Sequence, residues 1–172
     1  LSNSPKAASP LAKDARVRQA FELSIDRDAL NQVVFNGEFV PGNQWINPTN
    51  PYYQQSLPVP KRDVAKAKAL LKEAGVTAKI PLDFMVPNNP ETRQVAEVMQ
   101  SMLAETGFDL KIRVTEFATS LKQAEDGNYE LFLIGWSGRS DPDGNSFSFH
   151  TCGSPQNNSG FCDKDVDEWH KQ

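Results

Sequence analysis

Two periodicities alternate along this chain. Apolar residues recur every three to four positions in some stretches, as on one face of a helix, and at every second position in others, as along a half-buried strand. The helical stretches are two consecutive helices within 14–35, separated at Asp26, and single helices over 63–74, 90–106 and 118–126. The strand stretches are 80–86, 108–115 and 130–136.

The order of these elements predicts the fold class. Strand, helix, strand, helix, strand requires crossover connections, which give a largely parallel or mixed sheet flanked by helices. The last strand is apolar on the consecutive positions 131–134, which predicts burial on both faces. We therefore expect an α/β fold, and 172 residues are enough for one domain or one lobe of a larger protein.

The segment 40–60 breaks the pattern. It holds five prolines and no apolar periodicity, so we expect a long ordered loop, called the flap below. Trp45 within it is either a contact made by a lid over a ligand or packing that holds the loop in place.

Composition and charge exclude two classes of partner. The 18 basic and 22 acidic side chains are scattered and give a net charge of −4, so no basic cluster exists to neutralise a nucleic acid. The longest apolar run, 131–134, is too short to cross a bilayer.

Both ends of the chain predict an excised piece of a longer protein. The first ten residues lack an initiating Met and the basic and apolar regions of a secretory signal peptide. The last ten residues have the pattern of a helix without a C-terminal cap.

The candidate chemistry is concentrated after the last strand. Gly135 ends the apolar run, and Trp136, Arg139, Asp141 and Asp143 follow within eight positions. Loops at strand ends commonly carry ligand sites. The Arg139 guanidinium has two interpretations that are compatible: it clamps a carboxylate or phosphate of a ligand, or it pairs with a neighbouring aspartate to stiffen the loop.

A calcium site is disfavoured. In the acidic segment from Asp141 to Asn145, an EF-hand loop would need Gly at its sixth position and Glu at its twelfth, where this chain has Ser146 and Cys152. We interpret the segment as a turn in which Asp143 or Asn145 caps a short helix.

An enzyme is the alternative class of function. A hydrolase or metal-dependent enzyme would use His150 with Asp141 and Asp143, but no nucleophile elbow and no phosphate-binding glycine loop accompanies them. Packing is the favoured role for His150.

The two cysteines, Cys152 and Cys162, leave three possibilities open. They form a disulfide, remain free thiols, or bind a metal together with His150; the spacing matches no familiar zinc pattern.

Three segments resemble one known family. They are V-R-x-A followed by S-I-D-R-D-A-L within 17–30, A-K-A-L-L-K-E-A-G at 67–75, and Y-E-L-F-L-I-G-W followed by D-P-D within 129–143. In this order they resemble the extracellular solute-binding proteins of peptide/nickel-type ABC importers, which include oligopeptide- and dipeptide-binding proteins. The resemblance covers nearly the whole chain.

The resemblance implies a receptor without catalytic activity or a cofactor. Its members close two lobes around a small peptide or related solute and deliver it to a permease in the inner membrane. Residues 1–172 would be a single domain that forms most of the second, C-terminal lobe of a periplasmic monomer. A subset of relatives bridges two cysteines at the corresponding loop, which implies a disulfide between Cys152 and Cys162.

The resemblance also implies where a ligand would bind. The residues facing the cleft between the lobes would be Gly135, Trp136, Ser137, Gly138, Arg139 and Asp141, with Trp45 from the flap as a weaker candidate.

Two departures from the family bear on the ligand. Peptide-binding relatives hold the ligand's α-amino group with an Asp that falls at or beside Arg139 here, and dipeptide-binding relatives hold the carboxylate with an Arg where this chain has Val86 or Pro87. Both departures disfavour a peptide held by its free N-terminus, although Asp141 is a second candidate for the amine. They favour a ligand whose acidic group meets Arg139.

Overall fold

The centre of the molecule is a parallel sheet of three strands. The computed structural model describes residues 1 and 7–171. The strands are β1 (Ile80–Pro87), β2 (Phe108–Thr115) and β3 (Leu131–Phe132), in the order β2–β1–β3. Ile80 pairs with Phe108 at one end of β1 and Phe84 with Leu131 near the other. The expected α/β class and crossover topology are confirmed.

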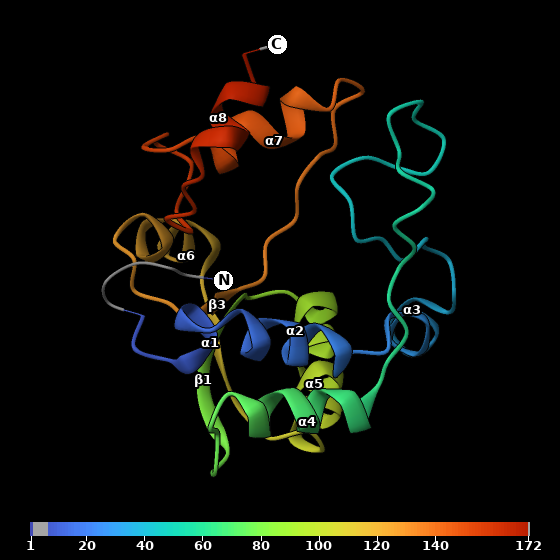
Figure 1. Ribbon diagram of the computed structural model, residues 1–172, viewed down its shortest axis with the longest axis vertical. Coiled ribbons are helices and arrows are strands. Elements are labelled where there is room, and N and C mark those ends of the chain that lie inside the picture. Colours follow the sequence, from blue (N-terminus) through green and yellow to red (C-terminus); the bar gives the residue numbers. More distant parts are fainter. Residues whose placement is uncertain (2–6, 172) are drawn as a thin grey trace.

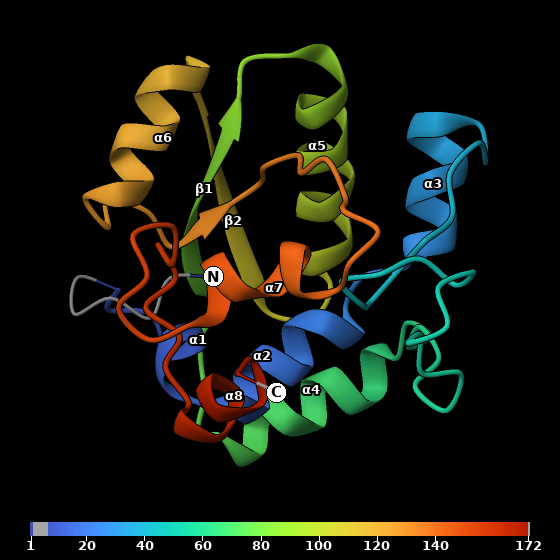
Figure 2. The ribbon, with the colours of Figure 1, turned by 90° about the horizontal axis from the view of Figure 1, so that it is seen from above.

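Helices connect the strands and cover the sheet. They are α1 (Pro10–Lys13), α2 (Ala15–Leu23), α3 (Arg27–Phe35), α4 (Val64–Glu73), α5 (Pro90–Ala104), α6 (Phe117–Glu125), α7 (Asp143–His150) and α8 (Lys164–Trp169). Along the sheet, the connection from β1 to β2 runs in one direction and the connection from β2 to β3 runs back past β1 in the opposite direction. Because both crossovers have the same hand, α5 and α6 lie on opposite faces of the sheet. Figure 2 shows this arrangement, with the strands between the two helices.

Side-chain caps set the starts of the predicted helices. Asp14, Asp26, Asp63 and Asn89 each precede a helix and accept a hydrogen bond from a backbone N–H two or three residues further on. Such caps satisfy donors that the first turn of a helix leaves free. The break at Asp26 and the starts of α4 and α5 therefore follow the prediction.

The core lies between one face of the sheet and the helices. Ile80, Leu82, Phe84 and Val86 alternate along β1 and are at most 3% exposed. Together with apolar residues of α2, α4, α5 and β2 they form one cluster, in which the ring of Phe21 meets that of Phe108 edge to face at 5.4 Å. Each such buried side chain stabilises the fold by about 1.5–3 kcal/mol.

The predicted strand over 130–136 is wrong in its second half. β3 ends at Phe132, and Leu133 N donates one further bond to Met85 O at 3.1 Å. Ile134 and Trp136 are 45% and 50% exposed, so the segment is not buried on both faces. In the described part of the chain β3 pairs with β1 alone, and after Leu133 the backbone leaves the sheet toward α7.

The C-terminal helices α7 and α8 lie beyond the carboxyl ends of the strands (Figure 1). Tyr129 Oη donates a hydrogen bond to Asn158 O at 3.0 Å, which ties the loop between these helices to the segment before β3. The chain therefore places one extended segment, 133–142, between the sheet and a small helical cap.

Candidate functional site

The candidate site is the segment from Gly135 to Pro142, called the site loop below. Its shape depends on one side chain of α7, Asn145, which is 4% exposed. Asn145 Oδ1 accepts hydrogen bonds from Trp136 Nε1 at 3.2 Å and from Arg139 N at 2.6 Å, and Asn145 Nδ2 donates to Arg139 O at 2.9 Å.

The helix-capping role expected for Asp143 or Asn145 is wrong. The helix α7 begins after Pro142, which makes no side-chain capping bond, and the amide of Asn145 points from inside the helix to the site loop. Sequence reasoning missed this role because an Asn at the start of a helix and an Asn one turn into it look alike in sequence, although only the first can cap the helix. The expected turn is present, since Asp141 Oδ1 accepts a hydrogen bond from Asp143 N at 2.9 Å.

Arg139 carries a charge that no carboxylate neutralises. Among the described residues, no ion pair includes Arg139. Its guanidinium lies 5.5 Å from the centroid of the Trp136 ring, and Nη1 donates to Ser137 O at 3.3 Å. Of the two interpretations of Arg139, pairing with Asp141 or Asp143 is therefore not formed, and the guanidinium is available to an anion.

Trp136 presents an aromatic surface beside this charge. Its ring packs edge to face with Phe149 of α7, with the centroids 4.7 Å apart, while half of the residue is exposed. Gly135, Ser137 and Gly138 are exposed in the same loop. An exposed aromatic face next to an unpaired guanidinium suits a small ligand with an apolar part and an acidic group.

The flap contacts both the site loop and α7. Asn50 Nδ2 donates a hydrogen bond to Ser140 O at 3.0 Å. The ring of Trp45 packs against that of His150 with the centroids 4.2 Å apart and the planes tilted by 53°, although Trp45 remains 62% exposed. The structure thus brings Trp45 to the helix that anchors the site loop.

The alternative catalytic set is not assembled. The His150 ring packs against Trp45 and Phe161, and its Nδ1–H donates to Ser146 O at 3.0 Å. Within the described residues no hydrogen bond joins His150 to Asp141 or Asp143. That part of the chain also holds no group of three or more His, Cys, Asp or Glu side chains placed for a metal ion. The packing role favoured for His150 is confirmed.

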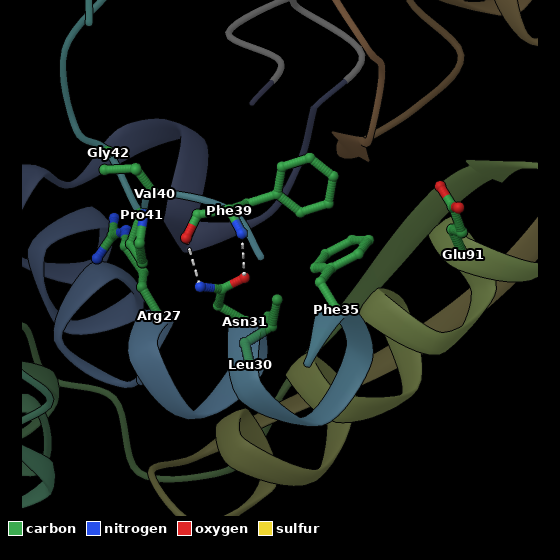
Figure 3. Close-up of a pocket in the computed structure, with 9 residues that line it drawn as sticks. All are labelled: Arg27, Leu30, Asn31, Phe35, Phe39, Val40, Pro41, Gly42 and Glu91. Carbon is green, nitrogen blue, oxygen red and sulfur yellow. Dashed lines mark hydrogen bonds between the residues drawn. The ribbon is translucent and has the colours of Figure 1, made fainter. Parts of the chain in front are cut away.

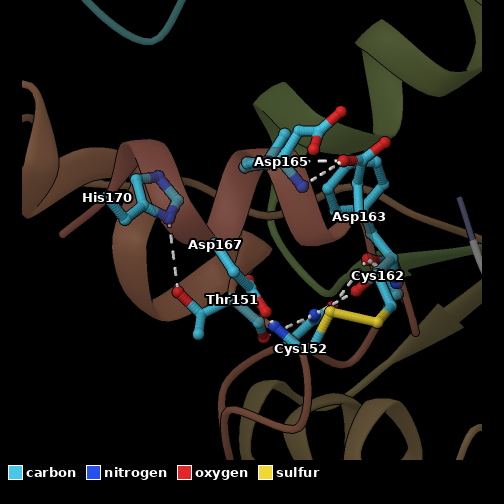
Figure 4. Close-up of a disulfide and its surroundings, with 11 residues drawn as sticks. Thr151, Cys152, Cys162, Asp163, Asp165, Asp167 and His170 are labelled. Carbon is cyan, nitrogen blue, oxygen red and sulfur yellow. Dashed lines mark hydrogen bonds between the residues drawn. A yellow bond between two sulfur atoms is a disulfide. The ribbon is translucent and has the colours of Figure 1, made fainter. Parts of the chain in front are cut away.

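The cysteines form a disulfide, so the free-thiol and metal interpretations are wrong. Cys152 and Cys162 are bridged with their Cα atoms 4.6 Å apart (Figure 4). Cys152 N donates to Asp167 Oδ1 at 3.0 Å, which links the bridge to α8. The bridge closes the loop that follows α7.

A separate apolar cavity of about 450 Å³ lies between α3 and the start of the flap (Figure 3). Its wall includes the apolar side chains of Leu30, Phe35, Phe39 and Val40. Two hydrogen bonds between Asn31 and the backbone of Phe39 hold the residue before the flap against α3. None of the predicted site residues lines it. Sequence reasoning missed it because its wall combines helix and loop residues without a shared period.

Comparison with known proteins assigns the family. The sequence pattern of the bacterial extracellular solute-binding proteins, family 5, middle region, matches residues 3–159. The chain belongs to this family. None of the helices among its described residues is long and apolar enough to cross a membrane.

Two curated relatives are named for small peptides. The chain is 33% identical over 154 residues to the dipeptide-binding protein of Escherichia coli (strain K12), covering 86% of this chain and 29% of the relative. It is 31% identical over 160 residues to di/tripeptide-binding protein 1 of Pseudomonas aeruginosa (strain UCBPP-PA14), covering 88% of this chain and 30% of the relative. The chain thus spans less than a third of the length of these relatives.

Solved structures share the fold. HbpA2 from Haemophilus parasuis superimposes with a TM-score of 0.87 at 26% identity, over 96% of this chain and 34% of that one. The periplasmic binding protein DppA from Helicobacter pylori, solved in complex with the peptide STSA, gives a TM-score of 0.84 at 24% identity, over 95% and 34% of the two chains.

Proposed function

We propose that this chain is a ligand-binding lobe of an ABC-importer receptor that captures a small peptide or related solute. Residues 1–172 form a single domain, which is most of the second, C-terminal lobe of a longer periplasmic protein. That protein works as a monomer without a cofactor, closes on its ligand and passes it to a permease in the inner membrane. It is not an enzyme.

The observation that carries this proposal is the position of the site loop. The loop follows β3 at the carboxyl edge of a parallel sheet, where α/β proteins commonly bind ligands. The loop itself is exposed, and it presents an aromatic ring and an unpaired guanidinium. The residues of the catalytic alternative are not assembled into a site. The named functions of the two curated relatives support a small peptide as the ligand class.

Within this proposal, Arg139 selects a ligand with an acidic group. The guanidinium can donate two parallel hydrogen bonds to a carboxylate. Trp136 and the backbone of Gly135, Ser137 and Gly138 contact the rest of the ligand. Asp141 and, from the flap, Trp45 lie at the rim of the site.

The first test is native mass spectrometry of the full-length protein, purified gently enough to retain what it carries. We expect a co-purified ligand of defined mass that is absent from an Arg139→Gln variant. In calorimetry with the dipeptide Ala-Glu, the variant should bind about 10- to 100-fold more weakly, as for the loss of a hydrogen-bonded charge pair.

Arg16→Gln is the matched control, because it removes the same charge from α2, where Arg16 pairs with Asp14. It should leave binding unchanged. A full-length protein that runs empty and hydrolyses peptides would overturn the proposal.

A further inference from the structure

We propose that Asn145 is a positioning residue of this site: its buried amide sets the shape of the site loop and thereby the placement of Trp136 and Arg139. The part of this inference that concerns ligand affinity rests on the proposed function. The part that concerns the loop does not, so the two can fail separately.

One amide side chain makes three hydrogen bonds to the site loop. The single oxygen Oδ1 accepts from the Trp136 side chain and from the Arg139 backbone, and Nδ2 donates to the carbonyl of the same Arg139. One side chain thus satisfies both backbone groups of Arg139 and the indole N–H, which is the only polar group of the Trp136 side chain. The amide is 4% exposed, so water cannot readily replace it, and leaving these groups unpaired would be costly.

Few other contacts hold the middle of the site loop. Residues 134–140 are exposed and form neither helix nor strand. Other described contacts to the loop are the packing of Trp136 on Phe149 and the bond from Asn50 to Ser140. Near the end of the loop, Asp143 N donates to Asp141 Oδ1 and Asn145 N donates to Pro142 O. Among the described residues, no other hydrogen bond holds the backbone of Arg139.

The helix α7 also comes close to the stem of Arg139, which is the aliphatic part of its side chain. A Cβ at Gly144 would lie 3.0 Å from Arg139 Cβ and 3.1 Å from its Cγ, closer than such contacts normally come. The helix can pack against the stem because position 144 has no side chain. Gly144 therefore leaves room for the stem while Asn145 holds the backbone. Both restrict where the guanidinium lies before a ligand arrives, which lowers the entropy cost of binding.

The loop part of the inference is tested by NMR on the full-length protein. We expect the Trp136 indole N–H and the Arg139 amide to exchange slowly in the native protein and at least tenfold faster in an Asn145→Ala variant. Ser24→Ala is the control, because Ser24 is also buried and hydrogen-bonded, to Ala20 and Thr106, but lies in the core. Equal protection of both groups in Asn145→Ala would overturn the inference.

A conservative variant guards against a folding defect. Asn145→Asp keeps an acceptor for Trp136 and for the Arg139 amide and loses the donor to the Arg139 carbonyl. It should therefore restore slow exchange of the indole and the amide. If Asn145→Asp folds and exchanges as fast as Asn145→Ala, the accepting role of Oδ1 is refuted.

The affinity part is tested with Ala-Glu as the probe. Asn145→Ala should weaken binding about tenfold. Combined with Arg139→Gln it should add little further loss, because both changes remove the same contact. Losses that multiply, or a loss no larger than that of Ser24→Ala, would overturn the positioning role. If the native protein does not bind Ala-Glu, the ligand assignment fails, and the exchange experiment still decides the role of Asn145.

Discussion

Removal of the disulfide should destabilise the protein by an amount that the loop length sets. The bridge joins Cys152 and Cys162, ten positions apart, in a region outside the main core. The perturbation is the double variant Cys152→Ala/Cys162→Ala, compared with the native protein before and after reduction. It removes no buried charge and leaves the core unchanged.

The magnitude follows from the entropy of the unfolded chain. For a closed loop of this length, the chain-entropy relation gives about 9 cal/mol/K, or about 2.7 kcal/mol at 25 °C. The native loop keeps other ties without the bridge, because Asn157 Nδ2 donates to Thr151 O at 3.0 Å and to Phe161 O at 2.6 Å. These bonds keep the native loop in place, so most of the loss should arise in the unfolded state.

Urea unfolding measures the effect. We expect the free energy of unfolding to fall by about 2–3 kcal/mol in the double variant and on reduction of the native protein. Adding the reductant to the double variant is the control, and it should have no effect. A change below about 1 kcal/mol would refute the reasoning, because it would mean that the unfolded chain gains little freedom when the bridge opens.

Two further predictions concern stability. Hydrogen bonds from the side chain and backbone N–H of Arg16 lower the pKa of Asp14 from 3.8 to about 2. This cap therefore stabilises α2 above about pH 4, and the contribution is lost as the pH falls through 2. In urea unfolding between about pH 5 and pH 2, the free energy of unfolding should fall less with decreasing pH in Asp14→Asn than in the native protein, and an equal fall would contradict the assignment. Gly107 has φ +127°, and a Cβ there would lie 3.1 Å from Leu71 Cδ1, so Gly107→Ala should cost more than about 1 kcal/mol in the same assay. Gly42→Ala, where a Cβ meets nothing within 4 Å, is its control and should change stability by less than about 0.5 kcal/mol; equal losses in the two variants would contradict the prediction.

The elements that the sequence predicts well are those with a long, uninterrupted period. Along β1 the alternation of Ile80, Leu82, Phe84 and Val86 marks the buried face directly, and Asp26 marks the start of α3 because its carboxylate caps that helix. Both signals are local, since each depends on residues a few positions apart. Tertiary packing then agrees with the local preference.

The prediction fails where the outcome depends on distant partners. The run 131–136 has the composition of a strand, yet Ile134 and Trp136 leave the sheet, because β3 pairs with β1 over two residues and then turns to α7. The short helix expected after the turn is present as α7, but its N-cap residue, Pro142, makes no side-chain capping bond, so the residue at which the helix begins was not predicted. The contact between Trp45 and His150 joins segments about a hundred residues apart, which no local pattern records.

The difference between local signals and distant partners also explains why only part of the site was predicted. The chemistry of Trp136 and Arg139 could be inferred from residue type and from their place after an apolar run. Whether Arg139 faced a carboxylate depended on the direction of its backbone, which Asn145 sets from the next helix. Asn145 holds that backbone with an uncharged amide, and among the described residues no ion pair includes Arg139. Under the proposed function, the unpaired guanidinium of Arg139 is therefore free to meet the acidic group of the ligand.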